Sequence, residues 1–344
     1  MCHPASNFLS HFILRALAED GIPAMGLNTR YANNEPALIM ERAAFDLGTG
    51  IRWMKEKLGF EQVILLGFSG GGSLASFYQS QALNPTITCT PAGDPAEFAG
   101  ADLIPADALL LVGAHPGRAQ VLRHWIDPAV TDETDPFAGD SALDLFDESR
   151  STPIDHEWIA TYRSAQLERM RRIDRWALDQ LPALEKSGAS DRAFVVHRTV
   201  ADPRFVDLSI DPSDRATGSM YGDPRRANSA AGGLARFSTV RNWLSTWSLD
   251  NTNADAFKDL PHITTPTLVM SLLADQAAFA EDSRLMHRAL PKPSTLVEMR
   301  HLNHYLVNQP DGLADVVSEL RRWLTDNDFE LQEHVPSSQQ EMTA

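Results

Sequence analysis

The strongest indication of how this chain folds is the run Val63-Ile64-Leu65-Leu66-Gly67-Phe68-Ser69-Gly70-Gly71-Gly72-Ser73. Four apolar residues run directly into the pattern Gly-x-Ser-x-Gly, and a helix-like segment, residues 74–82, follows at once. Strand, tight turn and helix in this order place a serine hydroxyl on a sharp turn above a sheet. Gly67 and Gly71 remove side chains that would collide where the strand and the helix approach each other. The pattern therefore predicts a nucleophilic Ser69, and an ordinary glycine-rich turn is the alternative interpretation.

Composition and charge limit the classes of protein to which this chain can belong. Its 344 residues suffice for one large α/β domain with an insertion, and 43% of them are hydrophobic, so a sizeable core can form. The formal net charge of −16 argues against nucleic acid and anionic membranes as partners. Cys2 and Cys89 are the only cysteines, which excludes a disulfide framework and a cysteine-rich metal site. Because no apolar run is long enough to cross a bilayer and no basic lead-in marks a signal peptide, we expect a cytoplasmic protein.

Helix and strand patterns alternate over residues 1–115 and return over residues 260–326. Such alternation predicts a parallel sheet with helices on both faces. Residues 116–259 lose the alternation and are rich in arginine, aspartate and tryptophan, which indicates a largely helical cap inserted into the core. Residues 327–344 are polar and are expected to form a disordered tail. The predicted strands lie at 22–27, 62–67, 108–113, 267–272 and 295–299, and the predicted helices at 7–19, 35–58, 74–82, 159–181, 283–290 and 313–324.

A serine hydroxyl needs a base that accepts its proton and an acid that orients the base. In a parallel sheet these groups belong on loops at the carboxyl ends of strands. Asp275 comes three residues after the strand at 267–272, and His304 comes five residues after the strand at 295–299. The order Ser69, Asp275, His304 is the serine–acid–histidine order of one large class of hydrolases.

With these residues in place, the chain resembles an α/β-hydrolase with a cap insertion. The resemblance rests on the serine turn, on residues 267–275 and on residues 300–306, which read Arg-His-Leu-Asn-His-Tyr-Leu. It covers residues 3–115 and 260–326. It implies an α/β-hydrolase fold: a mostly parallel sheet with helices on both faces and a largely helical cap.

Each partner of Ser69 has a rival. Asp282 is the nearest competitor of Asp275, and we expect it on the following helix. The preceding strand runs into residues 113–116, Gly-Ala-His-Pro, where no carboxylate is in reach. His301 competes with His304, and similarity to the family favours His304 as the base. His301 is then expected at the rim of the pocket or behind the reacting groups.

Backbone N–H groups are expected to stabilise the oxyanion that forms next to Ser69. Gly70 lies at the N-terminus of the helix after the serine, so its N–H points towards developing negative charge. The family takes a second donor from the loop before the first helix, often His-Gly-x, and this chain has His3-Pro4-Ala5 there. Because proline has no N–H, the resemblance assigns the second donor to Ala5. The further candidates for the pocket wall are His3, Phe68, His115 and His301.

The resemblance also implies a departure from the family at the N-terminus. In the family a strand leads into the His-x-x loop and lies between the strands predicted here at 22–27 and 62–67. The sequence starts at Met1, so we expect that this strand and the two before it are missing. Either the start lies inside a longer reading frame, or the missing strand is replaced in another way. A central gap would leave buried backbone groups unpaired, at roughly 1–3 kcal/mol per group.

The leading interpretation is a serine hydrolase that cleaves a carboxylic ester or lactone through an acyl-enzyme on Ser69, with no metal and no organic cofactor. We expect a small apolar ester, lactone or thioester as substrate. The same three residues support acyl transfer, thioester hydrolysis or carbon–carbon hydrolysis, and a non-catalytic ligand-binding protein on this scaffold is a further alternative. A homodimer is left open.

Overall fold

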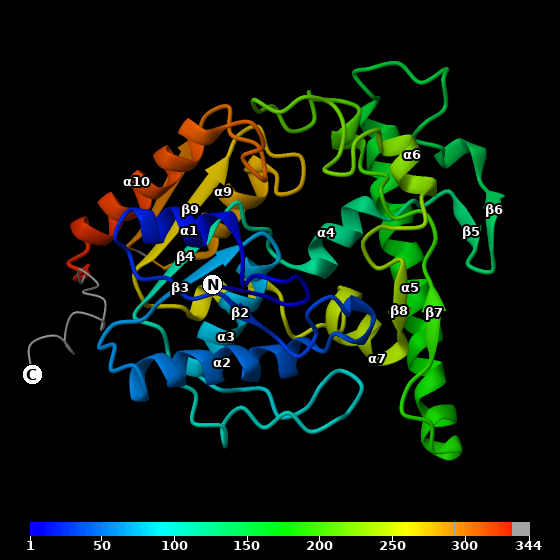
Figure 1. Cartoon of the computed structure of the whole chain (residues 1–344). Helices are drawn as coiled ribbons and strands as arrows, with labels where there is room; N and C mark the ends of the chain where they lie inside the picture. The colour runs from blue at the N-terminus through cyan, green and yellow to red at the C-terminus, as the bar shows by residue number, and fades with distance from the viewer. Residues whose placement is uncertain (292, 332–344) are drawn as a thin grey trace, which may run out of the picture.

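The computed structural model describes residues 1–291 and 293–331. Its centre is a parallel sheet in the order β10-β9-β4-β3 (Figure 1). The parallel order is the one that the alternation of helices and strands predicts. The four strands are β3 (Ile64–Phe68), β4 (Ala108–Val112), β9 (Thr267–Leu272) and β10 (Ser294–Met299).

Helices cover both faces of this sheet because successive strand residues point to opposite sides. Leu65, Leu109 and Val269 pack with apolar residues of α2, α3 and α9, whereas Leu66 and Leu110 pack with α1 and α10 on the other face. Figure 1 shows α1 and α10 on one side of the strands and α2 and α3 on the other. The helices are α1 (Phe12–Glu19), α2 (Met40–Glu56), α3 (Gly71–Leu83), α9 (Ala280–Ala289) and α10 (Pro310–Asp326).

Two of the predicted helices begin later than expected. His11 is the N-cap of α1, where its side chain accepts a hydrogen bond from Ile13 N–H, so residues 7–10 lie outside the helix. Residues 35–37 form a separate 3₁₀ turn, η1 (Glu35–Ala37), and α2 starts at Met40. Met40 N–H donates to Ser245 Oγ at 2.9 Å, so a residue of the insertion caps this helix.

The N-terminal residues lie in the position that we expected to be vacant, in a two-stranded sheet that is separate from the four-stranded one. β1 (Cys2–His3) pairs in parallel with β2 (Leu27–Asn28) and lies against β3. The Met1 amino group donates to Met25 O at 2.8 Å, and Leu27 N–H donates to Met1 O at 2.9 Å. The strand predicted at 22–27 is reduced to β2, because only two residues find a partner in β1.

The insertion forms its own helical layer beside the sheet (Figure 1). Trp125, Trp243 and Trp247 are fully buried in its apolar clusters, which is the structural role that helical tryptophans usually have. Core packing resumes at Ala254 rather than at residue 260, because α8 contacts α3. The elements of the insertion and its junction are α4 (Arg118–Trp125), β5 (Val130–Asp132), β6 (Asp135–Gly139), η2 (Ser141–Leu143), α5 (His156–Ser187), β7 (Ala193–Val195), η3 (Pro203–Phe205), α6 (Pro224–Ser229), β8 (Phe237–Thr239), α7 (Val240–Asn242), the π-helical turn η4 (Trp243–Trp247), α8 (Ala256–Asp259) and η5 (Leu260–His262).

The start of the predicted disordered tail is wrong. Phe329 is buried, its N–H donates to Leu324 O at 3.0 Å, and its ring stacks on Trp323. Residues 327–331 are therefore packed on α10, and the rest of the predicted tail, residues 332–344, lies outside the described residues. Over the described part of the chain, no helix has both the length and the apolar character that crossing a bilayer requires.

Candidate active site

Ser69 occupies a strained turn between β3 and α3. Its φ is 54°, in the left-handed region that a non-glycine residue rarely adopts. Gly72 N–H donates to Ser69 O at 3.0 Å, and His115 N–H donates to the same oxygen at 3.4 Å, which fixes the turn. A backbone conformation of this kind persists only where the surroundings enforce it, and it holds the serine hydroxyl above the carboxyl end of the sheet.

The glycines around the serine let the strand and the helix approach each other. A Cβ atom on Gly67 would lie 2.6 Å from Gly72 Cα and 2.8 Å from Gly71 O. A Cβ on Gly71 would collide with the carbonyl oxygen of Cys2 in β1. These neighbours are backbone atoms, which cannot move away without displacing α3 or β1.

Gly67→Ala is therefore expected to destabilise the protein by about 1–3 kcal/mol, the usual cost of overpacking a closely packed site. The melting temperature should fall by several degrees, and any activity of Ser69 should fall with it because the turn is displaced. Gly100→Ala is the control, since a Cβ at Gly100 meets no atom within 4 Å. Equal melting curves for Gly67→Ala and the wild type would contradict this packing argument.

The structure brings Ser69, His304 and Asp275 into one hydrogen-bonded chain. His304 Nε2 lies 3.0 Å from Ser69 Oγ, and His304 Nδ1 lies 2.6 Å from Asp275 Oδ2. His304 and Asp275 are both buried, whereas Ser69 is half-buried. A carboxylate oxygen accepts, so Nδ1–H donates to Asp275 and leaves Nε2 able to take the serine proton.

The loop after β9 holds Asp275 rigidly. Its Oδ1 accepts hydrogen bonds from Ala277 N–H at 2.6 Å and from Ala278 N–H at 2.9 Å, so only Oδ2 faces His304. The rival acid, Asp282, lies on α9 as expected and faces Arg204 of the insertion at 3.6 Å. The chain of hydrogen bonds to Ser69 thus runs through Asp275.

His301 and Phe68 do not line a pocket at Ser69 in the way that we expected. His301 is exposed, and its Nδ1 lies 3.3 Å from Asp214 Oδ2, so its ring is engaged outside the hydrogen-bonded chain. Phe68 is 1% exposed and packs behind His304, with 5.1 Å between the ring centroids. Its role in the structure is to support His304 from the core side.

Ala5 cannot serve as the second oxyanion donor in the arrangement seen here. Its N–H donates to His3 Nδ1 at 3.2 Å, and Ser6 N–H donates to the same nitrogen at 2.8 Å. The imidazole of His3 folds back over its own loop, and its Nδ1 accepts the amide hydrogen of Ala5 that the resemblance assigned to the oxyanion. Gly70 is placed as expected, at the N-cap of α3, and among the described residues no backbone partner takes its N–H.

Two imidazoles lie next to Gly70. A Cβ on Gly70 would be 2.7 Å from His3 Nε2 and 3.3 Å from His115 Nε2. Burial, reinforced by the positive charge of Arg118, lowers the pKa of His3 well below its ordinary value and that of His115 to about 3. Both rings are therefore neutral around pH 7.

Sequence reasoning missed three contributors to this region. His11 packs against Phe68, and burial together with His304 lowers the pKa of His11 to about 4. Tyr305 packs edge-on against His304, and Arg118 pairs with Glu35. Tyr305 belongs to residues 300–306, on which the resemblance rests, but no contact with His304 was predicted for it. Nothing in the spacing links residue 11 or 118 to the serine.

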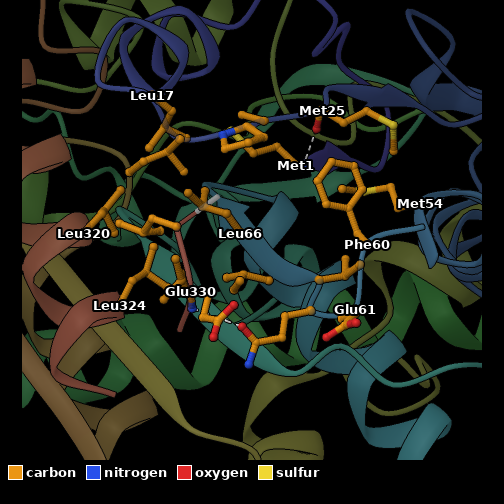
Figure 2. Close-up of a pocket in the computed structure, with 18 of the residues that line it drawn as sticks. Met1, Leu17, Met25, Met54, Phe60, Glu61, Leu66, Leu320, Leu324 and Glu330 are labelled. Carbon is orange, nitrogen blue, oxygen red and sulfur yellow. Dashed lines mark hydrogen bonds between the residues drawn. The ribbon is translucent and has the colours of Figure 1, made fainter. Parts of the chain in front are cut away.

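A separate pocket of about 280 Å³ lies at the opposite end of the sheet (Figure 2). It is lined by Val63, which precedes β3, and by Ile64, the first residue of β3. Ser69, in contrast, directly follows the last residue of that strand. Met1, Leu320 and Leu324 also line it, and Figure 2 shows their side chains around the opening. This pocket does not contribute to the candidate active site.

The architecture of the core is that of an α/β-hydrolase, so the mostly parallel sheet with helices on both faces that the resemblance implies is confirmed. It consists of the parallel sheet, the covering helices on both faces, and the serine turn followed by the loops of Asp275 and His304.

Comparison with known proteins finds only distant similarity. No family model and no curated protein matches the chain. Among solved structures, the chain is similar to a monoacylglycerol lipase of Paleococcus ferrophilus, with 13% identity, coverage of 94% of this chain and 93% of that chain, and a TM-score of 0.43. It is similar to the esterase domain of a Rhodothermus marinus protein, with 14% identity, coverage of 91% and 78%, and a TM-score of 0.41. The α/β hydrolase GrgF of Penicillium sp. sh18 gives 13% identity, coverage of 94% and 88%, and a TM-score of 0.45. At such low identity no activity is carried over to this chain, and its function has to be inferred from its own side chains.

Proposed function

We propose that this protein is a serine hydrolase that cleaves a carboxylic ester or lactone through an acyl-enzyme on Ser69. One observation carries the proposal: the continuous hydrogen-bonded chain from Asp275 Oδ2 through His304 to Ser69 Oγ, with distances of 2.6 and 3.0 Å. A base within hydrogen-bond reach of the nucleophile, itself oriented by a third group, is the arrangement that activates a serine.

The reaction begins when Ser69 Oγ attacks the carbonyl carbon while its proton passes to His304 Nε2. The carbonyl π electrons move onto the oxygen, and the resulting oxyanion accepts a hydrogen bond from Gly70 N–H. The bond to the leaving alkoxide then breaks as His304 returns the proton to it. Water attacks the acyl-enzyme with His304 as base, and the carboxylic acid leaves as Ser69 is reprotonated. Asp275 holds the imidazole and stabilises its positive charge in both steps.

Contacts between the insertion and the loop that carries Asp275 support the proposal that the insertion acts as a cap. Phe279, four residues after Asp275, packs against Phe205 of the insertion. Gln276 Nε2–H groups donate to the carbonyl oxygens of Ala216 and Thr217, each at 3.1 Å. The loop that carries the acid is therefore in contact with the insertion. We propose a small apolar ester, lactone or thioester as substrate, held between the two.

A panel of nitrophenyl esters of graded acyl length, with a lactone and a thioester, tests the proposal and reports the size of the pocket. The wild type should hydrolyse at least one member, and Ser69→Ala should show only the rate of the buffer. If product analysis with added alcohol finds acyl transfer, the acyl-enzyme on Ser69 still forms, and the alcohol rather than water accepts the acyl group. Equal rates for Ser69→Ala and the wild type would refute the proposal.

A further inference from the structure

His3 holds its imidazole beside Gly70 in one fixed orientation. His3 is the last residue of β1, is 7% exposed, and its ring stacks on Phe8 with 5.1 Å between the centroids. Its Nδ1 accepts the two amide hydrogens of Ala5 and Ser6. Stacking and two hydrogen bonds together leave the ring little freedom to turn.

These hydrogen bonds also determine which nitrogen carries the proton. A ring nitrogen that accepts from N–H groups has no hydrogen of its own, so the proton of neutral His3 is on Nε2. Protonation of Nδ1 would place three hydrogens against one another. Burial and the charge of Arg118 oppose it further, since they lower the pKa of His3 well below its ordinary value.

The fixed donor Nε2–H lies beside Gly70, the residue whose N–H is expected to stabilise the oxyanion. Among the described residues no hydrogen bond engages His3 Nε2, and a Cβ on Gly70 would lie 2.7 Å from it. Gly70 N–H is also unused by the backbone around it. Two free donors, one from the backbone and one from a side chain, thus lie next to Ser69.

From this geometry we infer that His3 Nε2–H is the second hydrogen-bond donor to the oxyanion, in place of the Ala5 amide. The inference rests on the proposed function, because it assigns a role in the same acyl transfer. His3 donates a hydrogen bond and transfers no proton: the negative charge stays on the former carbonyl oxygen, and the serine proton stays on His304. A neutral, preorganised donor in a buried site stabilises such a charge without reorganisation.

His115 is the nearest competitor for this role. Its Nε2 would be 3.3 Å from a Cβ on Gly70, and its pKa is lowered to about 3 by burial and Arg118. Its Nδ1, however, is buried with no hydrogen-bond partner among the described residues. No amide N–H therefore holds Nδ1 of His115 as an acceptor, whereas two amides hold Nδ1 of His3 in that role.

His3→Asn keeps the hydrogen-bond acceptor of the His3 side chain and removes its hydrogen-bond donor. Asparagine Oδ1 is bonded to the same atom, Cγ, as histidine Nδ1, so it can still accept from Ala5 and Ser6, but the Nε2–H donor is lost. We expect kcat to fall by about 10²–10³-fold, the usual effect of removing one oxyanion donor, with little change in KM. The affinity for a boronic acid that forms a tetrahedral adduct on Ser69 should fall with kcat, and the melting temperature should stay close to that of the wild type.

The matched variants are His115→Asn and Ser69→Ala. A loss in His3→Asn that clearly exceeds the loss in His115→Asn supports the inference. Wild-type kcat in His3→Asn, or the larger loss in His115→Asn, overturns it while Ser69→Ala remains inactive. If Ser69→Ala keeps the wild-type rate, the proposed function itself fails, which is a different result.

A measurement on the unaltered protein covers the case in which His3→Asn does not fold. Nitrogen-15 spectra of histidine-labelled wild type should show His3 protonated on Nε2 alone at pH 7. Its Nε2–H proton signal should shift downfield when the boronic acid binds. A proton on Nδ1, or an Nε2–H signal that does not respond to the adduct, would overturn the inference.

Discussion

Ser69→Ala is expected to lower kcat/KM for the best ester of the panel by about 10⁴–10⁶-fold, the range found when the nucleophile of such a chain of residues is removed. The reason is chemical: without Oγ no acyl-enzyme can form, and His304 has no hydroxyl to activate. Initial rates with the same ester, corrected for the buffer, give the measurement.

Ser76→Ala is the matched control, because it removes a buried hydroxyl seven residues further along the chain, in α3. Ser76 Oγ donates only to Gly72 O within α3, at 2.9 Å. Its loss should change the rate by less than about tenfold, since the removal of one such hydrogen bond costs about 0.5–1.5 kcal/mol. A similar fall in both variants would mean that Ser69→Ala acts through the fold and not through the chemistry.

Asp275→Asn is expected to lower kcat by about 10⁴-fold while the protein stays folded. Asparagine can keep Oδ1 towards the amides of Ala277 and Ala278, so that its NH₂ group replaces Oδ2 opposite His304. An NH₂ group donates, which forces His304 Nδ1 to accept and moves the ring proton to Nε2. In that tautomer His304 cannot take the proton of Ser69.

Asp214→Asn is the control for Asp275→Asn, since Asp214 is the carboxylate that faces the rival histidine, His301. If His304 and Asp275 are the working pair, Asp214→Asn should keep most of the activity. A large loss in Asp214→Asn with a small loss in Asp275→Asn would transfer the roles to His301 and Asp214. Thermal unfolding of each variant separates loss of activity from loss of structure.

The serine turn could be predicted from the sequence because everything that forms it is local. The strand, the two close-approach glycines and the start of α3 lie within one short run, residues 63–73. Asp275 and His304 could be placed near Ser69 for a related reason, since the carboxyl ends of parallel strands meet at one edge of the sheet. Asp275 was preferred to Asp282 from its position directly after a buried strand, whereas the choice of His304 over His301 was decided by similarity to the family.

Features that depend on distant contacts could not be predicted. The start of α2 at Met40 is set by Ser245, which is 205 positions away in the sequence. The second oxyanion donor was assigned to a backbone amide, but that amide is taken by His3, whose ring is held by stacking on Phe8. Sequence spacing carries no information about such side-chain packing.

The short strand β1 beside β3 could not be predicted from the sequence for the same reason. Strand patterns of five or six residues are visible in a sequence, whereas β1 has only two residues and is recognised by its pairing with Leu27 and Asn28. The end of α10 is similar, because Phe329 is fixed by its contact with Trp323 rather than by any local helical pattern.

The most direct test of the central claim is to locate a covalent adduct on the chain. The protein is treated with a fluorophosphonate, digested, and its peptides are analysed by mass spectrometry. We predict one phosphonyl group on Ser69 in the wild type and no labelling of Ser69→Ala. A folded wild-type protein that stays unlabelled, or one that is labelled at another residue, would contradict the account.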